Sequence, residues 1–214
     1  NILVQDMNEE IIVAAEDIVS LDLTQLEYED PVNPEKRTRR AKIAQDADFL
    51  YNKRLYTPES FDVTSGQIRL LHSGGDGTYD TVFVDEYKSY IVDRVVLENQ
   101  TVYFKEGETY QNKTGFKFDT DDEEKQYHLY DAEGNEMEFT DIAPDMVISL
   151  TSDVNQTINY ATLSTNKVEG EVTLLDTDAN EIAIDGQTYQ LYRGQSETYQ
   201  IGQTGVFLLN HNQE

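Results

Sequence analysis

Hydrophobic and polar residues alternate along much of this chain with the period of two that a half-buried β-strand requires. The pattern is clearest in Gly66–Val92, where short alternating runs flank the glycine-rich stretch Ser73–Gly77. Glycine and aspartate supply the positive-φ backbone and the side-chain caps of a tight reversal. This segment therefore predicts a β-hairpin that leads into a third strand.

Strand–turn–strand patterns also fill the rest of the sequence. We expect a hairpin over Tyr127–Phe139 about the turn Asp131–Asn135, then a one-turn connector before the strand Met146–Leu150. Met7–Ile18 can also be interpreted as a short amphipathic helix, but its β-branched residues favour strands. The other predicted strands are Leu21–Leu23, Leu26–Tyr28, Thr101–Phe104, Gly115–Phe118, Ile158–Leu163, Val172–Leu175, Ile182–Ile184, Tyr189–Tyr192 and Val206–Leu209.

These elements predict an all-β fold of two or three small barrel or sandwich modules in tandem, with one-turn helices only. The expected modules are residues 1–95, with the Gly/Asp-rich hairpin, residues 96–166, and residues 167–214, a small barrel-like module. The chain begins inside an apolar run without a methionine, and His211–Glu214 resembles a turn whose return strand is missing. We therefore expect it to be a piece of a longer protein.

The charge balance argues against two classes of partner. The chain has 42 acidic and 16 basic residues, a formal net charge of -26. Proteins bind nucleic acids and anionic membranes largely through lysine and arginine, so this field repels both. No apolar run approaches the roughly 18 residues of a transmembrane helix, so membrane insertion is not expected. The chain has no cysteine, which excludes disulfides, zinc–thiolate sites and thiol catalysis.

The loop between His72 and Asp80 invites a calcium interpretation, because acidic loops can surround a hard cation with oxygen atoms. Asp76 and Asp80 are the candidate ligands, but His72 and Gly74 occupy the first two ligand places. Calcium takes about six to eight oxygen ligands, more than this loop offers. An ordinary glycine-rich hairpin is therefore favoured, and no cofactor is expected.

One basic island stands out in this acidic sequence. It comprises Lys36, Arg37, Arg39 and Arg40. The simpler interpretation is an exposed strand whose long side chains pair with neighbouring carboxylates. The functional interpretation is an electrostatic docking patch for an acidic neighbouring subunit.

The sequence shows no catalytic signature. His72, His128 and His211 are far apart and have no metal-binding spacing, and no nucleophile, phosphate-binding or dinucleotide-binding motif occurs. We therefore expect no enzyme. Tyr87, Tyr90 and Tyr103 could serve as stacking platforms for carbohydrate, but packing across a sheet explains them more simply.

The resemblance to known proteins is carried by four segments, ADFLYNKRL, SGQIRLLHSGGDGTYDTVFVDEYKSYIV, YDAEGNEMEFTDIAPDMVISLTSD and KVEGEVTLLDTDANEIAIDGQTYQL. Their order resembles the β-rich modules of Gram-positive S-layer-type surface proteins and of related phage virion structural proteins. The resemblance implies an extracellular, non-enzymatic assembly module of a cell surface or a phage particle such as its tail. Its partners would be other protein subunits, in a homo-oligomer or a larger assembly. The alternative is an extracellular carbohydrate- or calcium-binding module.

Overall fold

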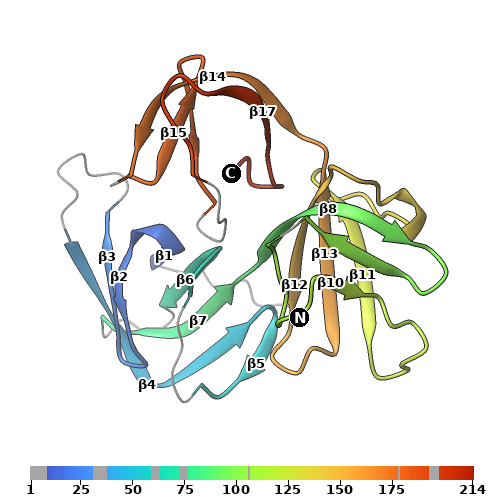
Figure 1. Cartoon of the computed structure of the whole chain (residues 1–214). Helices are drawn as coiled ribbons and strands as arrows, with labels where there is room; N and C mark the ends of the chain where they lie inside the picture. Colours follow the sequence, from blue (N-terminus) through green and yellow to red (C-terminus); the bar gives the residue numbers. More distant parts are fainter. Residues whose placement is uncertain are drawn as a thin grey trace. The chain divides into compact units, whose positions relative to one another are not determined.

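The computed structural model describes residues 9–30, 38–58, 63–72, 77–105, 107–177, 179–192 and 198–214. Their strands form three sheets, and the helical segments within these ranges are two single 3-10 turns, Ala15–Asp17 (η1) and Phe139–Asp141 (η2). The predicted all-β fold class is confirmed. The chain divides into two compact units, Asn1–Glu86 and Tyr87–Glu214 (Figure 1).

The first unit is a seven-stranded sheet of order β1-β6-β7-β4-β3-β2, with β5 paired to β4. Neighbouring strands are antiparallel except β4 and β7, which are parallel. The strands are β1 (Glu9–Ala14), β2 (Ile18–Leu21), β3 (Gln25–Glu29), β4 (Thr38–Tyr51), β5 (Arg54–Tyr56), β6 (Gln67–His72) and β7 (Tyr79–Asp85).

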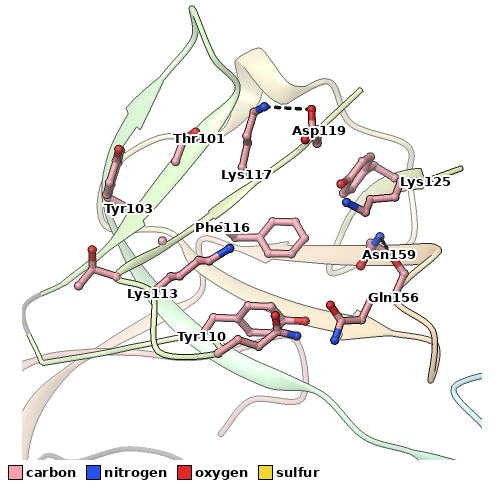
Figure 2. Close-up of a pocket in the computed structure, with 14 residues that line it drawn as sticks. Thr101, Tyr103, Tyr110, Lys113, Phe116, Lys117, Asp119, Lys125, Gln156 and Asn159 are labelled. Carbon is pink, nitrogen blue, oxygen red and sulfur yellow. Dashed lines mark hydrogen bonds and ion pairs between the residues drawn. The ribbon is translucent and has the colours of Figure 1, made fainter. Parts of the chain in front are cut away.

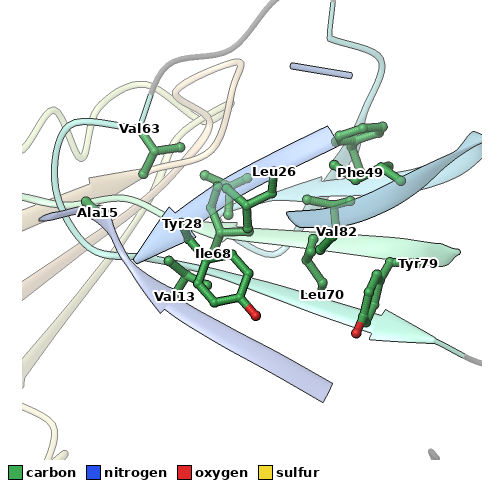
Figure 3. Packing of buried hydrophobic residues seen from close by; sticks show 13 residues of the cluster. Val13, Ala15, Leu26, Tyr28, Phe49, Val63, Ile68, Leu70, Tyr79 and Val82 are labelled. Carbon is green, nitrogen blue, oxygen red and sulfur yellow. The ribbon is translucent and has the colours of Figure 1, made fainter. Parts of the chain in front are cut away.

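The core of the first unit follows from alternation along its strands. Leu26 of β3, Ile68 and Leu70 of β6, and Val82 of β7 are each fully buried, and their side chains gather together in Figure 3. Burying each such side chain stabilises the fold by roughly 1.5–3 kcal/mol, before conformational entropy is counted. The antiparallel pairing of β6 with β7 confirms the predicted hairpin, whose tip at residues 73–76 lies outside the described residues.

The strand interpretation of the N-terminal segment is also confirmed over β1 and β2, which η1 joins. The reversal from β2 to β3 is capped by Asp22. Its carboxylate accepts the Thr24 hydroxyl (2.7 Å) and the backbone N–H groups of Thr24 (2.7 Å) and Gln25 (2.9 Å). These hydrogen bonds, that of the Thr24 hydroxyl first, hold the pKa of Asp22 below its ordinary value.

The second unit contains a six-stranded sheet of order β10-β9-β8-β12-β13-β11, in which β11 and β13 are parallel. Its strands are β8 (Lys88–Val96), β9 (Thr101–Phe104), β10 (Gly115–Lys117), β11 (Gln126–Asp131), β12 (Val147–Ser152) and β13 (Ile158–Ser164). Its core is rich in aromatic residues. The ring of Tyr90 stacks on Phe104 at 4.2 Å between centroids, and Phe118 packs edge-on against Phe116 and Phe139.

A four-stranded antiparallel sheet of order β16-β15-β14-β17 completes the second unit. Its strands are β14 (Lys167–Asp176), β15 (Glu181–Ile184), β16 (Gln187–Gln190) and β17 (Thr204–Leu208). Its buried hydrophobic cluster is small, with Val172, Ile182 and Ile184 at the centre and partly buried side chains such as Tyr199 and Phe207 around them. A core of this size provides modest stability by itself.

The structure differs from two expectations. The expected boundary after residue 95 falls inside β8, whereas the chain divides into its two units between Glu86 and Tyr87, because β8 pairs with β9 about the turn at 97–100. The turn Asp131–Asn135 forms as expected, but beyond the isolated bridge between Tyr130 and Glu136 the chain enters η2 instead of a return strand. β14 begins at Lys167, directly after the expected boundary at residue 166, but both sides of that point belong to the same compact unit.

Candidate functional site

The basic island lies partly in β4. Arg39 pairs with Asp30 (Nε to Oδ2, 2.7 Å), and Arg40 pairs with Glu27 and lowers its pKa through that hydrogen bond. Both arginines are exposed on the strand, and they have the carboxylate partners that the simpler interpretation expects. Lys36 and Arg37 lie outside the described residues, so a docking role for the island stays a hypothesis.

The calcium hypothesis gains no second ligand from the structure. Asp76 lies outside the described residues, and the Asp80 carboxylate in β7 accepts the Thr81 hydroxyl at 3.2 Å. Across the described ranges, no group of three or more His, Cys, Asp or Glu side chains is arranged to hold a metal ion.

The three candidate stacking tyrosines have different surroundings. Tyr87 and Tyr90 are buried, and the Tyr90 hydroxyl donates to the Thr109 carbonyl (3.3 Å). Burial raises the pKa of the Tyr90 phenol, as expected for a ring inside the core. Tyr103 is half-buried, with the guanidinium of Arg94 over its ring at 4.0 Å. Of the three, Tyr103 lines a cleft that also contains three lysines.

A buried polar cluster connects the C-terminal turn of the second unit with β8 and β12. At its centre is Asn210, of which 1% is exposed. Its side-chain oxygen accepts the backbone N–H groups of Asn212 (2.9 Å) and Glu214 (3.1 Å). Its Nδ2 donates to the Glu214 carboxylate (2.6 Å) and to the Ser89 hydroxyl (3.2 Å). All four hydrogen-bonding positions of this amide are therefore occupied.

Two serine hydroxyls extend the cluster to His211. Ser89 Oγ lies 2.8 Å from Ser149 Oγ, which lies 3.0 Å from His211 Nδ1. Because Asn210 donates to Ser89, donation from Ser89 to Ser149 and from Ser149 to Nδ1 gives each hydroxyl one donor and one acceptor partner. This series of hydrogen bonds requires the His211 imidazole to be neutral, with its proton on Nε2. Burial of His211 favours the same state, because it lowers the pKa of the ring.

Tyr87 closes the cluster from the start of the second unit. Its hydroxyl donates to the Glu214 carboxylate (2.7 Å) and accepts from Asn212 Nδ2 (2.9 Å). The His211 ring packs edge-on against the Tyr87 ring at 4.8 Å between centroids. We call the set Tyr87, Ser89, Ser149, Asn210, His211 and Glu214 the polar junction.

In the polar junction, Ser149 and His211 lie as close together as a catalytic serine and histidine do, but the Ser149 hydroxyl is not accessible to a substrate. A nucleophilic serine must reach a substrate as well as its base. Ser149 is only 2% exposed, and its hydroxyl lies between Ser89 and His211. The arrangement is suited to holding the C-terminal turn against the six-stranded sheet.

We expect acid to weaken the second unit through His211. Burial places its folded-state pKa below the ordinary value of 6.5, so the unfolded chain binds the proton more readily. The contribution of neutral His211 to the stability of the second unit should be fully present above about pH 6.5. It should decrease as the pH falls from there toward the folded-state pKa. Thermal melting between about pH 7.5 and pH 5.5 tests this, and His211→Gln should flatten the slope.

His128→Gln is the matched control for this pH effect, because His128 stacks on Tyr160 in β13 away from the polar junction. It should leave the slope unchanged. Hydrogen bonds from Lys125 and Asn135 hold the pKa values of Asp122 and Asp131 below their ordinary value, so these two carboxylates do not contribute to the slope in this pH range. A slope that survives in His211→Gln would contradict the assignment.

Three clefts lie in the described part of the second unit. One, of about 350 Å³, lies beside β11 and the segment 136–139 and includes His128 and Phe139. A second, of about 310 Å³, is lined mainly by apolar side chains of β15 to β17 and their loops, such as Ile184, Leu191 and Phe207.

The third cleft, of about 330 Å³, is bounded by β9, β10, the turn Tyr110–Lys113 and the start of β13 (Figure 2). We call it the lysine cleft, because three lysines line it. Its lining residues are Lys113, Lys117, Lys125, Tyr103, Tyr110, Gln111, Phe116, Asp119, Tyr127, Gln156, Asn159, two threonines and a glycine.

Comparison of the sequence with protein-family models, with curated proteins and with solved structures gives no match. The candidate sites therefore rest on their own geometry. The described residues contain no helix of the length and apolarity that a membrane crossing would need.

Sequence reasoning missed most of the polar junction and of the lysine cleft. Their residues come from distant segments, as Ser89 and Asn210 do. One local signal was available, since Asn210 and His211 follow directly after the apolar run of β17, where a buried polar side chain needs partners.

Proposed function

We propose that this chain is a non-enzymatic structural module that assembles with other subunits, in a bacterial surface layer or a phage virion, through the edges of its sheets. The observation that carries the proposal is the position of three of the eight large apolar residues that are exposed in the described ranges. Ile12 in β1, Val19 in β2 and Val206 in β17 are 53%, 53% and 54% exposed. Each of these strands ends its sheet.

Such edges favour association with neighbouring chains. An edge strand presents unpaired backbone N–H and C=O groups, and an apolar side chain beside them gains by being covered. The free energy of a contact of this kind would come from burying Val206 or Ile12 against a second copy, with the strand backbone setting the register.

The acidic surface would control this association. Copies that each carry a net charge of -26 repel one another, and salt shortens the range of that repulsion to about 10 Å at 0.1 M. The polar junction supports a spacer role, since it ties the C-terminal turn to β8 and β12 by buried hydrogen bonds. The resemblance of the sequence to surface-layer and virion modules supports the same role.

Sedimentation or light scattering of the full chain tests the proposal. We expect the mean mass to rise with protein concentration at about 500 mM NaCl and to stay near that of a monomer at about 20 mM, because salt screens the repulsion. Val206→Lys and Ile12→Lys should each reduce the association, since they place a charge on an edge strand.

Leu97→Lys is the matched control for these variants. Leu97 is exposed but lies in the turn between β8 and β9, away from a sheet edge, so its substitution should leave the association unchanged. A chain that stays monomeric at high salt and high concentration would overturn the proposal. An equal effect of Leu97→Lys would overturn the assignment to the edges.

A further inference from the structure

We propose that the lysine cleft binds an acidic saccharide. This binding site goes beyond the proposed assembly role and does not depend on it. Three properties of the cleft carry the inference, namely its local charge, the backbone turn at its rim, and its aromatic floor with amide side chains beside it.

The charge of the lysine cleft is opposite to that of the chain. Its lining holds three lysines and one aspartate, in a protein with 16 basic and 42 acidic residues. Lys117 pairs with Asp119 (2.9 Å), and Lys125 pairs with Asp122 (2.9 Å). Lys113 is exposed and forms no ion pair with a residue that the structure describes. An anionic group of a ligand in the cleft could therefore form an ion pair with the Lys113 ammonium group.

The turn Tyr110–Lys113 at the rim places Lys113 beside the cleft, and two residues of this turn have positive φ angles. Tyr110 and Lys113 exchange backbone hydrogen bonds of 2.8 and 2.9 Å, which close a two-residue reversal. Its central residues, Gln111 and Asn112, have φ values of 51° and 62°. Such turns favour Asn-Gly, and a glutamine in the left-handed region costs roughly 1–2 kcal/mol. The same conformation occurs in other turns of the chain, such as those at Lys53 and Gln100, so the turn contributes by fixing the backbone of Lys113 beside the cleft.

The floor of the cleft is aromatic. Figure 2 shows the Phe116 ring in the middle of the cleft, between Lys113 on one side and Asn159 on the other. Tyr110 and Tyr127 pack edge-on against Phe116 at 5.3 and 6.1 Å between centroids, which fixes the ring. A rigid aromatic surface suits the apolar C–H face of a sugar ring, whereas a simple anion gains nothing from it.

Two glutamine amides can meet the sugar hydroxyls. The side chains of Gln111 and Gln156 line the cleft and form no hydrogen bond with another described residue. The volume of about 330 Å³ lies at the lower end of small-molecule sites, which suits a mono- or disaccharide. A long polyanion such as nucleic acid is disfavoured, because the net charge of -26 repels it.

Calorimetric titration of the full chain tests this site with three probes: cellobiouronic acid, its neutral counterpart cellobiose, and inorganic phosphate. At low salt we expect the acidic disaccharide to bind about tenfold more tightly than cellobiose, and more tightly than phosphate. About 500 mM NaCl should remove most of that preference. Lys113→Gln should lower the affinity for cellobiouronic acid about fivefold or more and leave the affinity for cellobiose unchanged.

Two further variants make the test specific. Lys167→Gln removes an exposed lysine of β14 outside the cleft and should change neither affinity. Gln156→Ala should weaken both disaccharides, because it removes an amide that meets their hydroxyls. The proposal is overturned by the absence of saturable binding, by equal affinity for the acidic and neutral disaccharides, or by phosphate binding as tightly as the acidic one. It is equally overturned if Lys167→Gln acts like Lys113→Gln.

Discussion

Asn210→Ala is expected to lower the free energy of unfolding of the second unit by about 3 kcal/mol. The substitution removes four side-chain hydrogen bonds at a position that is 1% exposed, so water cannot replace them. It leaves two backbone N–H groups of the C-terminal turn and the Glu214 carboxylate short of partners. Because the chain has two units, amide hydrogen exchange in β12 and β14 should report the loss.

Asn155→Ala is the matched control for that loss. Asn155 is exposed in the turn between β12 and β13, and its side chain forms no hydrogen bond with another described residue. The change should stay within about 0.5 kcal/mol. If Asn210→Ala were no more destabilising than Asn155→Ala, the polar junction would not hold the unit together, and the support that it gives to a spacer role would be lost.

A double-mutant cycle separates the polar junction from simple packing. Ser89 forms hydrogen bonds with both Ser149 and Asn210, so removal of either of these two side chains breaks the same series of hydrogen bonds. The loss in Asn210→Ala combined with Ser149→Ala should therefore fall short of the sum of the single losses by about 0.5 kcal/mol or more. Strictly additive losses would show that the two side chains act independently.

The local elements of this fold could be predicted from sequence, because their causes are local. Alternation places Ile68 and Leu70 on one face of β6, whichever strand lies beside it. The turn at Asp131 forms because its carboxylate accepts the backbone N–H groups of Glu133 (3.0 Å) and Asn135 (2.8 Å). Such hydrogen bonds need only residues that are neighbours in sequence.

Strand pairing could not be predicted in the same way. β11 lies parallel to β13 instead of forming a full hairpin, since the chain turns into η2 and returns as β12 first. Likewise, β4 pairs in parallel with β7, whose hairpin partner β6 lies between them in sequence. Period-two patterns fix which face of a strand is buried, but not which distant strand completes its hydrogen bonds.

The candidate sites were harder still to predict, because their chemistry depends on these pairings. Tyr87, Tyr90 and Tyr103 look alike in sequence, yet Tyr90 lies in the core on Phe104 while Tyr103 lines the lysine cleft. The reversal at Gln111 and Asn112 lacks the glycine that marks such turns, so it reads as a plain polar stretch. Lys113 and Gln156 line the same cleft, although β10, β11 and β12 lie between them in the sequence.

Gly66→Ala should have an effect of similar size on the first unit, a loss of about 4 kcal/mol in the free energy of unfolding. Gly66 has φ of +80°, and a Cβ atom there would lie 1.9 Å from the Asp85 carbonyl oxygen and 3.2 Å from Glu86 Cα. These are backbone atoms at the end of β7, so no side-chain rotation relieves the overlap. The Gly66 carbonyl also accepts the Ala15 N–H (2.9 Å), which ties η1 to β6. Thermal melting and hydrogen exchange of β6 and β7 should show the loss.

Gly77→Ala separates the overlap from the backbone strain, because Gly77 has the same φ of +80° and no atom of a described residue lies within 4 Å of its would-be Cβ. It lies in the same unit and should cost only about 1–2 kcal/mol, the penalty of an alanine in the left-handed region. The difference between the two losses in free energy of unfolding then reports how closely the backbone before β6 approaches the end of β7. Equal losses would mean that this approach is not close, and that the β6–β7 pairing is looser at Asp85 than its register requires.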